Sequence, residues 1–304
     1  MPDYAIAVHG GAGAIRKNLE REAEYRAVLD AALDAGKSLL EKGGSAVDAS
    51  VAAVAVMEDS PLYNAGCGAV FNANGFCELD AAVMDGKTRK TGGVAGVTEI
   101  KNPVYAALAV LRHSRHVLLG GAGAHDFARL HDVATVENAY FHTEERLRQL
   151  HEAQEKGRVQ LDFSEDGQAK GTVGAVARDQ NGDLAAATST GGLTNKSAGR
   201  IGDTPVTGAG TYAENGICAI SCTGTGDEIM RIVMAYDIAA QMRYTGADFA
   251  AAAQAALDKL AAIDGEGGLI GITAKGEIYL PFNSKGMFRG SFRAGDAKNF
   301  TAIF

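Results

Sequence analysis

Tryptophan is absent from this 304-residue chain, and proline (5 residues) and cysteine (4 residues) are scarce. The cysteines Cys67, Cys77, Cys218 and Cys222 form no C-x-x-C pair or Cys/His cluster, which favours small buried side chains over zinc ligands. No apolar run approaches the roughly 20 residues that span a bilayer, so we expect no membrane partner. The net charge of −8 argues against a nucleic-acid partner, because phosphates attract a cationic surface.

Glycine is abundant, at 39 residues or about twice its average share, and lies among Val, Ile, Ala and Leu. Such glycines serve tight turns and close backbone approaches rather than disorder. The hydrophobic share of 46% supports a sizeable core. The first residues show no basic segment followed by an apolar one, so we expect a cytoplasmic protein with reduced thiols.

The N-terminal half predicts a strand at 4–8 that leads into His9-Gly-Gly-Ala-Gly13. Helical patterns cover 19–42, then 45–56 with Ser45 as N-cap, then 103–116 and 125–130. Between these helices the region 63–97 predicts strands punctuated by glycine, including a hairpin at 71–76 with an Asn-Gly turn. Residues 143–170 are rich in charged side chains and predict a short exposed helix followed by a mobile linker.

The C-terminal half opens directly into a strand. Hairpins are predicted at 172–190 and 211–222, helices at 227–244 and 247–262, and a closing hairpin around Lys275-Gly276. Antiparallel hairpins with paired helices favour layers of α, β, β and α.

Gly171-Thr172-Val173-Gly174 follows the polar stretch directly. Threonine is common in strands, so this segment alone would be an ordinary strand. Three further segments, 187–192, 199–203 and 221–227, carry Thr, Arg and Asp at strand ends or in the turns that follow. Side chains at such places can converge on one site.

Taken together, these segments make the sequence similar to the plant-type asparaginases, also called isoaspartyl aminopeptidases, within the N-terminal nucleophile hydrolases. The resemblance covers nearly the whole chain and includes 9–13, 60–68, 92–97 and Pro281-Phe-Asn283. Several motifs in one order are far more specific than any one of them.

The resemblance implies an α+β fold, a four-layer αββα sandwich in which two antiparallel-rich sheets are flanked by helices. It also implies self-cleavage between Gly171 and Thr172. The products would be an alpha subunit, 1–171, with a mobile C-terminal linker at about 150–171, and a beta subunit, 172–304. The two subunits would form one composite domain and pair into a dimer of heterodimers.

The chemistry at Thr172 depends on its side-chain hydroxyl and on its main-chain nitrogen. A threonine hydroxyl is a poor nucleophile at neutral pH and needs a base. Cleavage would free an α-amino group with a reference pKa of about 7.7–8.0, far below that of lysine. One residue would then supply both nucleophile and base, so the uncut chain should be inactive on external substrate.

The other roles implied by the resemblance follow the needs of an acyl-transfer site. Thr190 would hydrogen-bond Thr172, and Thr223 with Gly224 would donate to the oxyanion. Substrates such as asparagine and β-aspartyl dipeptides share a free α-carboxylate and α-ammonium. Arg200 suits the carboxylate and Asp203 the ammonium, and the rest of the expected substrate-binding set comprises Thr225, the Gly226 carbonyl and Asn64.

The resemblance also implies a structural sodium ion but no catalytic cofactor. Its ligands would be backbone carbonyl oxygens, which suit a hard cation. An ordinary helix end followed by a tight turn explains the same segment equally well. The candidate residues are Met57, Glu58, Ser60, Tyr63, Ala65 and Cys67.

Four alternatives remain open. One is a specialised protease of the same superfamily, which is disfavoured because no long specificity insertion is evident. A glycosylasparaginase would share fold and nucleophile, but that branch is typically secreted or lysosomal and carries an Asp-Thr-Ile-Gly type of motif. A non-catalytic binding protein on the same scaffold is disfavoured by the intact threonines. A nucleotide site is disfavoured because no Lys-Ser/Thr follows the glycine-rich 223–226 loop. We expect structural or surface roles for His9, His113, His116 and His125.

Overall fold

The structure is a computed structural model that describes residues 3–15, 17, 20–157, 159 and 171–304. Its larger sheet has eight strands within the described residues, antiparallel except for the β3–β4 pair. In spatial order these are β12 (Phe300–Ala302), β11 (Gly286–Arg293), β1 (Ala5–Gly13), β5 (Val173–Arg178), β6 (Leu184–Thr190), β2 (Leu79–Asp85), β3 (Thr91–Val97) and β4 (Leu118–Gly120).

A smaller antiparallel sheet packs on the centre of the larger one. Its strands, in spatial order, are β10 (Ile278–Tyr279), β9 (Gly267–Thr273), β8 (Cys218–Gly224) and β7 (Thr211–Glu214). Strands β8 and β9 contact β1 and β5, while β7 contacts β6 and β2. The two sheets therefore face each other across a shared interior.

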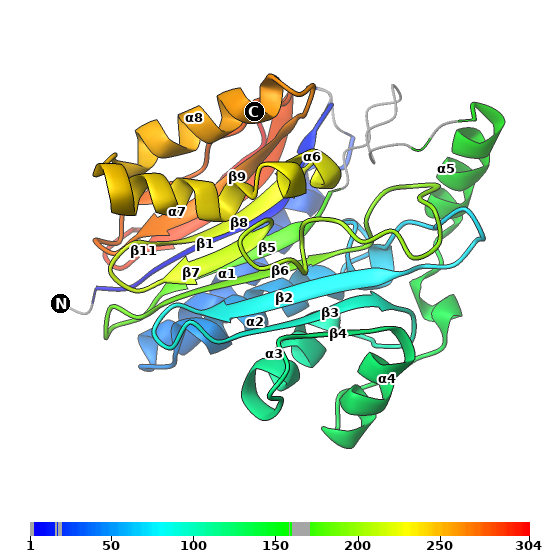
Figure 1. Cartoon of the computed structure of the whole chain (residues 1–304), viewed down its shortest axis with the longest axis horizontal. Coiled ribbons are helices and arrows are strands. Elements are labelled where there is room, and N and C mark those ends of the chain that lie inside the picture. Colours follow the sequence, from blue (N-terminus) through cyan, green and yellow to red (C-terminus); the bar gives the residue numbers. More distant parts are fainter. Residues whose placement is uncertain (1–2, 16, 18–19, 158, 160–170) are drawn as a thin grey trace.

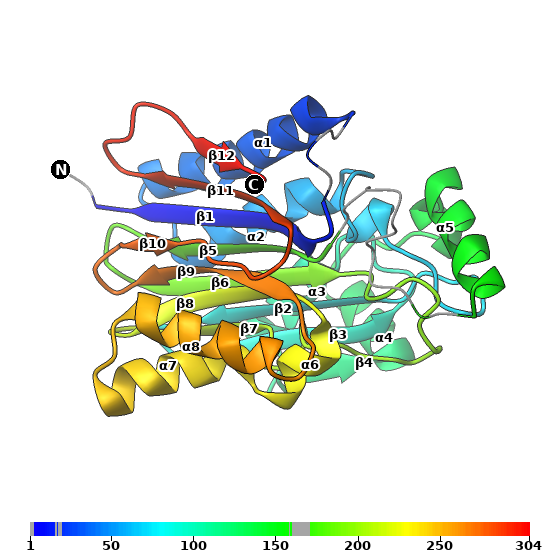
Figure 2. The ribbon, with the colours of Figure 1, turned by 90° about the horizontal axis from the view of Figure 1, so that it is seen from above.

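Helices contact the outer face of each sheet (Figures 1 and 2). On the larger sheet these are α1 (Glu22–Glu41), α2 (Ala46–Glu58) and α3 (Pro103–His113). On the smaller sheet they are α7 (Met234–Thr245) and α8 (Phe249–Ala261). The remaining helices are α4 (Gly121–Leu130), α5 (Glu144–Glu155), α6 (Gly226–Arg231) and the short η1 (Gly66–Gly68) and η2 (Asn138–Phe141). The prediction of a mixed α+β fold is confirmed.

Alternate side chains of β1 belong to two different apolar clusters. Ile6 and Val8 belong to the apolar cluster under α1 and α2, whereas Ala5 and Ala7 belong to the cluster between the sheets. Both faces of the strand are buried, as expected for a central strand that has helices on one side and a sheet on the other. Up to the bulge after His9, the odd-numbered residues of β1 therefore point between the sheets, and His9 is one of them.

Several predicted elements are confirmed. Helix α2 has Ser45 as its N-cap, whose side chain accepts a hydrogen bond from the Asp48 N–H. The hairpins β5–β6 and β7–β8 and the turn at Gly276 are all present. The predicted start of the first helix, at residue 19, lies outside the described residues.

Other boundaries were wrong. Strand β1 continues through Gly13 instead of ending at Val8. The segment 71–76 forms a turn capped by the Asn72 side chain but no pair of named strands. Helix α3 ends at His113, and the short edge strand β4 was not predicted. The single helix expected at 227–244 is broken into α6 and α7 at Val233, which has a left-handed φ of 49°.

Helix α5 is the short helix expected before the linker, but it is not wholly exposed. The Arg146 side chain is fully buried, and its Nε donates to the Gly68 carbonyl at 2.7 Å. Helix α5 therefore braces the loop between α2 and β2. Most of the predicted mobile linker, residues 158 and 160–170, lies outside the described residues.

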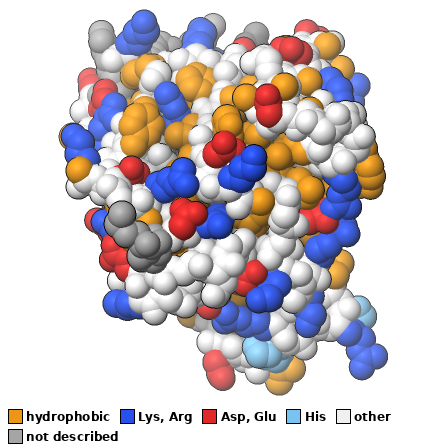
Figure 3. Space-filling view, turned by 90° about the vertical axis from the view of Figure 1, so that its left-hand side faces the viewer, with side chains coloured by type: hydrophobic (Ala, Val, Ile, Leu, Met, Phe, Trp, Pro, Cys, Tyr) orange, Lys and Arg blue, Asp and Glu red, His pale blue; other side chains and the backbone are white. Residues whose placement is uncertain are grey.

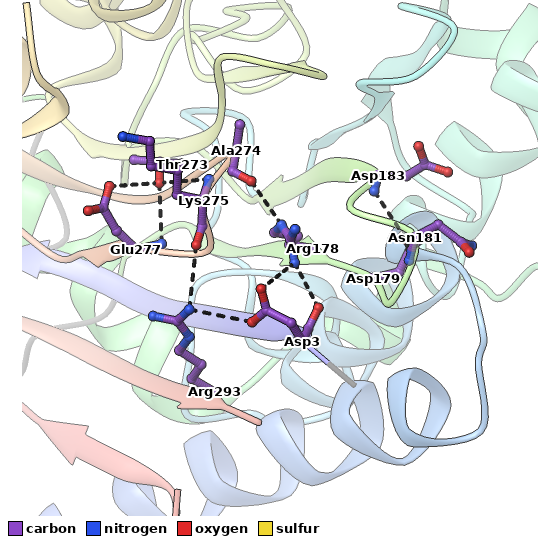
Figure 4. A network of polar contacts seen from close by, with 10 residues as sticks. All are labelled: Asp3, Arg178, Asp179, Asn181, Asp183, Thr273, Ala274, Lys275, Glu277 and Arg293. Atoms are coloured by element: carbon purple, nitrogen blue, oxygen red, sulfur yellow. Dashed lines mark hydrogen bonds and ion pairs between the residues drawn. The ribbon is translucent and has the colours of Figure 1, made fainter. Parts of the chain in front are cut away.

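An ion-pair network covers the end of β5 that is remote from Thr172 (Figure 4). Arg178 donates to the Ala274 carbonyl at 3.0 Å and to the Asp3 carbonyl at 2.7 Å, and it pairs with the Asp3 carboxylate at 3.2 Å. Arg293 reaches the same carboxylate at 3.4 Å. On this side of the molecule, acidic and basic side chains are interspersed with hydrophobic ones (Figure 3).

Candidate active site

Thr172 lies immediately before β5, beside the end of β6. Its Oγ1 donates to Thr190 Oγ1 at 3.0 Å, and Thr190 Oγ1 also accepts the Gly192 N–H at 3.0 Å. The antiparallel register, which pairs Val173 with Ser189, brings the two threonines together across the strands. The structure thus joins the predicted nucleophile to its predicted partner.

The residue before Thr172 lies against β1. A Cβ on Gly11, whose φ is +110°, would stand 2.4 Å from Gly171 Cα, so the two backbones touch. A bulge in the β1–β11 ladder between His9 and Gly11 accompanies this approach. Gly11 of the 9–13 segment is therefore needed because no side chain fits between β1 and the bond before Thr172.

Asn64 reaches the same region from the loop after α2. Its Nδ2 donates to the Gly192 carbonyl at 2.7 Å, while its Oδ1 accepts the Val70 N–H at 3.0 Å. The side chain thus touches the turn whose N–H binds Thr190. Asn64 therefore reaches the turn after Thr190, but neither of these hydrogen bonds is with Thr172.

Arg200 lies in the loop after β6, with its side chain 14% exposed. Its Nη2 and Nε donate to the two carboxylate oxygens of Asp227, at 2.7 and 3.4 Å. Its Nη1 lies 3.2 Å from where a Cβ on Gly192 would stand, on the Thr190 side of the guanidinium. Asp227, which lies in the predicted 221–227 segment but was assigned no role, therefore binds one edge of the guanidinium and leaves Nη1 beside Gly192.

Asp203 is buried beside the start of α6. A Cβ on Gly226 would stand 2.5 Å from Asp203 Oδ1 and 3.1 Å from Arg200 Nη2, so the predicted partners of both substrate charges meet at Gly226. Within the described residues Asp203 Oδ2 has no hydrogen-bond partner. Burial raises the pKa of Asp203 to about 7, and Arg200 opposes this shift.

Thr223 and Gly224 end strand β8. Thr223 is 1% exposed, and its Oγ1 has no hydrogen-bond partner among the residues described. Gly224 packs on the Glu266 carbonyl, where a Cβ would lie 2.2 Å from the oxygen. The Thr225 N–H and hydroxyl donate to that carbonyl, at 2.9 and 3.2 Å, so Thr225 is held in the loop.

Three residues that the sequence did not indicate fix the loop that carries Arg200. The carboxylate of Glu78 accepts the Gly199 N–H at 3.1 Å, and its backbone carbonyl accepts Lys196 Nζ at 2.8 Å. Lys196 is 1% exposed and Asp80 is fully buried. Burial lowers the pKa of Lys196 and raises that of Asp80, and each charge opposes the shift of the other. The start of β2 thus anchors this loop by buried charges.

The six candidate sodium ligands lie together at the end of α2 and in the loop through η1. The carbonyls of Met57 and Ala65 already accept N–H groups within the loop, at 3.2 Å each. The carbonyl oxygens of Glu58 and Tyr63 face Gly66 and Gly68, where a Cβ would stand 2.1 Å from each oxygen. No cluster of three or more His, Cys, Asp or Glu side chains that could hold a metal ion occurs in the part of the chain described.

The histidines divide into buried and peripheral ones. His9 is fully buried, and its Nε2 lies 2.9 Å from Ser221 Oγ, a contact that the sequence gave no sign of. His125 accepts the Thr98 N–H at 2.9 Å, and the ring of His113 stacks on that of His131 at 4.8 Å. His116 is exposed. The expectation of structural or surface roles fits these placements, but His9 lies directly behind the site.

The sequence is similar to those of known asparaginases and isoaspartyl peptidases. A family model described as Asparaginase matches residues 2–302. The chain is 48% identical to an isoaspartyl peptidase of Salmonella typhimurium over 304 residues, which cover 97% of each chain. It is equally 48% identical to an isoaspartyl peptidase of Escherichia coli, over 97% of this chain and 95% of the relative. A plant-type L-asparaginase of Pyrobaculum calidifontis is 39% identical over 96% of this chain and 98% of its own.

The chain therefore belongs to the asparaginase family, as its motifs predicted. It is an enzyme of the hydrolase class. Among its described helices, none has the length and apolar character needed to cross a membrane.

Proposed function

We propose that this chain is a self-cleaving amidohydrolase that hydrolyses β-aspartyl dipeptides and L-asparagine through an acyl ester on Thr172. The observation that carries the proposal is the hydrogen bond of 3.0 Å between Thr172 and Thr190, formed directly after Gly171. The names of the similar enzymes, isoaspartyl peptidase and plant-type L-asparaginase, supply the substrate class. The layered arrangement of two facing sheets between helices supports the four-layer αββα sandwich as part of the same proposal.

The first step would release the nucleophile from the chain. The Thr172 hydroxyl attacks the Gly171 carbonyl carbon, the Gly171–Thr172 C–N bond breaks, and the amide becomes the α-amino group of Thr172. Water then hydrolyses the ester that joins Gly171 to the Thr172 oxygen. The close approach of Gly11 leaves room for no side chain on that face of the scissile bond. The products would be the subunits 1–171 and 172–304 in one composite domain.

In turnover the free amine accepts the Thr172 hydroxyl proton while the oxygen attacks the side-chain carbonyl of the substrate. The buried Thr223 hydroxyl and the Gly224 N–H would donate to the oxyanion. The leaving amine or ammonia takes the proton, and water hydrolyses the aspartyl ester. Asp203, whose Oδ1 lies beside Gly226, would bind the substrate ammonium, and Arg200 would bind the α-carboxylate.

The test is a paired assay on purified protein. Wild-type protein should appear as two fragments that meet at Gly171/Thr172 by denaturing mass analysis. It should release ammonia from asparagine and leucine from β-aspartyl-leucine. Thr172→Ala should remain one chain and do neither, whereas Thr245→Ala, at an exposed threonine of α7, should behave as wild type. Cleavage and hydrolysis that persist in Thr172→Ala would refute the proposal. Glycoasparagine turnover equal to that of β-aspartyl-leucine would favour the glycosylasparaginase alternative.

A structural sodium ion is part of the proposal. The loop offers backbone carbonyl oxygens, the kind of ligand that suits a hard cation, and those of Glu58 and Tyr63 each pack against a glycine, Gly66 and Gly68. The full candidate set is the backbone carbonyls of Met57, Glu58, Ser60, Tyr63, Ala65 and Cys67. When bound, the ion would fix the loop from which Asn64 reaches Gly192. The dimer of heterodimers and the cytoplasmic location likewise stay predictions.

A further inference from the structure

A buried lysine lies in the loop that carries Arg200, and the proposed mechanism gives it no part. Lys196 is 1% exposed, and its Nζ donates to the Glu78 carbonyl at 2.8 Å. No carboxylate oxygen of the described residues lies within ion-pair distance of this nitrogen. A buried ammonium is costly unless a nearby charge compensates it. One neutral carbonyl supplies no such charge, so the position of Lys196 calls for an explanation.

The side chain of Lys196 ends at Gly192. A Cβ on Gly192, whose φ is +80°, would stand 2.8 Å from Lys196 Nζ and 3.2 Å from Arg200 Nη1. The two cationic groups therefore converge on one face of the Gly192 α-carbon. Gly192 is also tied to the candidate site, because its N–H binds Thr190 and its carbonyl binds Asn64. Glycine is required here, since a side chain at this positive φ would push Lys196 Nζ away.

Arg200 presents its remaining nitrogen at the same place. Its Nε and Nη2 donate to the Asp227 carboxylate, at 3.4 and 2.7 Å. Within the described residues Nη1 makes no hydrogen bond. A Cβ on Gly202 would stand 3.0 Å from Nη1, so this nitrogen lies between two glycines. The guanidinium nitrogen that remains for a substrate carboxylate is therefore the one beside Gly192, next to the Lys196 ammonium.

The acids near Lys196 favour its charged form. Burial lowers the pKa of Lys196, and the carboxylates of Asp80 and Glu78 oppose this shift. Each of these carboxylates already accepts a backbone N–H, that of Gly96 at 2.8 Å and that of Gly199 at 3.1 Å. The groups that meet at Gly192 itself are both cations. An anion bound there would offset their mutual repulsion.

We propose that Lys196 is a specificity-determining residue whose buried ammonium, beside Arg200 at Gly192, favours substrates with a free α-carboxylate. This inference rests on the proposed function, in which Arg200 binds that carboxylate. The ammonium acts through its electric field and without touching the substrate, so it raises the affinity for a carboxylate but not for a neutral amide in its place. Burial reinforces the effect, because water and salt screen a buried charge less than an exposed one.

A pair of ligands separates this charge effect from packing. L-aspartate carries the α-carboxylate, whereas L-aspartic acid α-amide has a neutral amide in its place and is otherwise the same. Both are measured as competitive inhibitors of β-aspartyl-leucine hydrolysis. In Lys196→Met, which keeps most of the side chain but not its charge, the Ki of aspartate should rise about 5- to 30-fold. The Ki of the α-amide should change by less than about twofold.

The kinetic constants of Lys196→Met should change in the same sense. The KM for β-aspartyl-leucine should rise with the Ki of aspartate, while kcat stays within about threefold of wild type. Equal rises in the two Ki values, or no rise in either, would overturn the proposal. Lys259→Met is the matched control, because it removes a half-exposed lysine of α8 that pairs with Asp237. It should leave both Ki values unchanged.

A second substitution separates the lost charge from the lost hydrogen bond. In Lys196→Gln the amide can still donate to the Glu78 carbonyl but carries no charge. It should show the same selective loss of aspartate affinity. Aspartate binding as in wild type would assign the effect to the hydrogen bond and contradict the proposal. Melting temperatures of both variants show whether they are folded.

The wild-type protein gives a test that no folding defect can obscure. In NMR of enzyme with ¹³C-labelled lysine, aspartate should raise the pKa of Lys196 more than the α-amide does, because a nearby carboxylate favours the ammonium. Equal changes with the two ligands would overturn the inference. Wild-type protein that hydrolyses neither substrate refutes the proposed function, whereas active protein in which Lys196 does not distinguish the two ligands refutes only this inference.

Discussion

The two ends of strand β5 differ in how their polar groups are satisfied. At the Arg178 end, a guanidinium binds two backbone carbonyls and a carboxylate, and its neighbours Asp3 and Arg293 are also paired (Figure 4). At the Thr172 end, buried oxygen or nitrogen atoms of Thr223, Asp203 and His9 have no partner among the described residues.

This difference distinguishes polar groups that stabilise the fold from polar groups that are available for function. Buried polar atoms in folded proteins are almost always paired, and each exception calls for an explanation. At the Arg178 end the charged groups already have partners within the chain, so we expect them to contribute to stability. At the Thr172 end, the proposed function gives Asp203 and Thr223 partners outside the chain, namely the substrate ammonium and the oxyanion. Substitutions at the two ends should therefore have opposite signatures.

The largest effect should come from Thr223→Val, which removes the unpartnered hydroxyl and keeps the shape. If the hydroxyl donates to the oxyanion, kcat should fall roughly 10²- to 10³-fold with little change in KM. The melting temperature should stay the same or rise, because an unsatisfied buried hydroxyl is removed. Steady-state kinetics and a thermal melt check both parts. A fall in stability with kcat preserved would assign Thr223 to the core.

Asp203→Asn should lower kcat/KM by about 100-fold, chiefly through KM, because the substrate ammonium loses its counter-charge. Although the substitution should lower activity, it should raise the stability of the folded protein above neutral pH. The folded pKa of about 7 lies above the ordinary value, so the native state holds the proton more tightly than the unfolded chain. The contribution of Asp203 to stability is full below about pH 4 and is lost as pH rises through about 7.

The same variant should therefore melt at a higher temperature than wild type at pH 8 and at a similar one at pH 4. A rise of at least about 2 °C at pH 8 is expected. Equal melting curves at both pH values would mean that Asp203 is paired in solution.

The pH dependence of activity sharpens the comparison. Ammonium binding needs the Asp203 carboxylate, and attack needs the neutral α-amino group of Thr172, so both protonations lower kcat/KM of wild type below about pH 7. Log kcat/KM should rise with a limiting slope of about two in acid, and Asp203→Asn should reduce that slope to about one. A slope of one in both proteins would remove Asp203 from the titration.

The smallest effect on activity should come from the other end of the strand. Arg178→Ala leaves the Ala274 and Asp3 carbonyls without their donor, which should cost about 1–2 kcal/mol of stability. The melting temperature should fall by roughly 2–6 °C. The values of kcat and KM should match wild type. A change in kcat larger than about twofold would show that the two ends are coupled.

Local signals made much of the fold predictable. Ser45 predicted the start of α2, and the glycine-containing turns predicted the hairpins of both sheets. The break between α6 and α7 could not be predicted, because a β-branched Val233 is a poor choice for a left-handed φ. The contacts that hold α7 in place are tertiary, since its Ala235 and Tyr236 N–H groups donate to the Ala209 and Gly208 carbonyls.

The candidate site was predictable only where residues form motifs. Thr172, Thr190, Arg200, Asp203 and Thr223 stand in recognisable segments. The structure joins Thr172 to Thr190 and brings Arg200 and Asp203 together at Gly226. The supports of these residues could not be found in this way. Glu78 and Asp80 meet Lys196 from a distant part of the sequence, and His9 likewise meets Ser221. Such pairings depend on strand order and register, which no short segment encodes.

The most direct test of Thr172 as nucleophile is to trap its ester. Mature enzyme mixed with excess β-aspartyl-leucine, quenched in acid and digested, should yield an N-terminal peptide of the beta subunit that carries an aspartyl group on the Thr172 side-chain oxygen. Peptide mass spectrometry with fragmentation identifies the residue. An adduct on any other residue, or rapid turnover with no adduct on Thr172 under conditions that trap esters, would contradict the account.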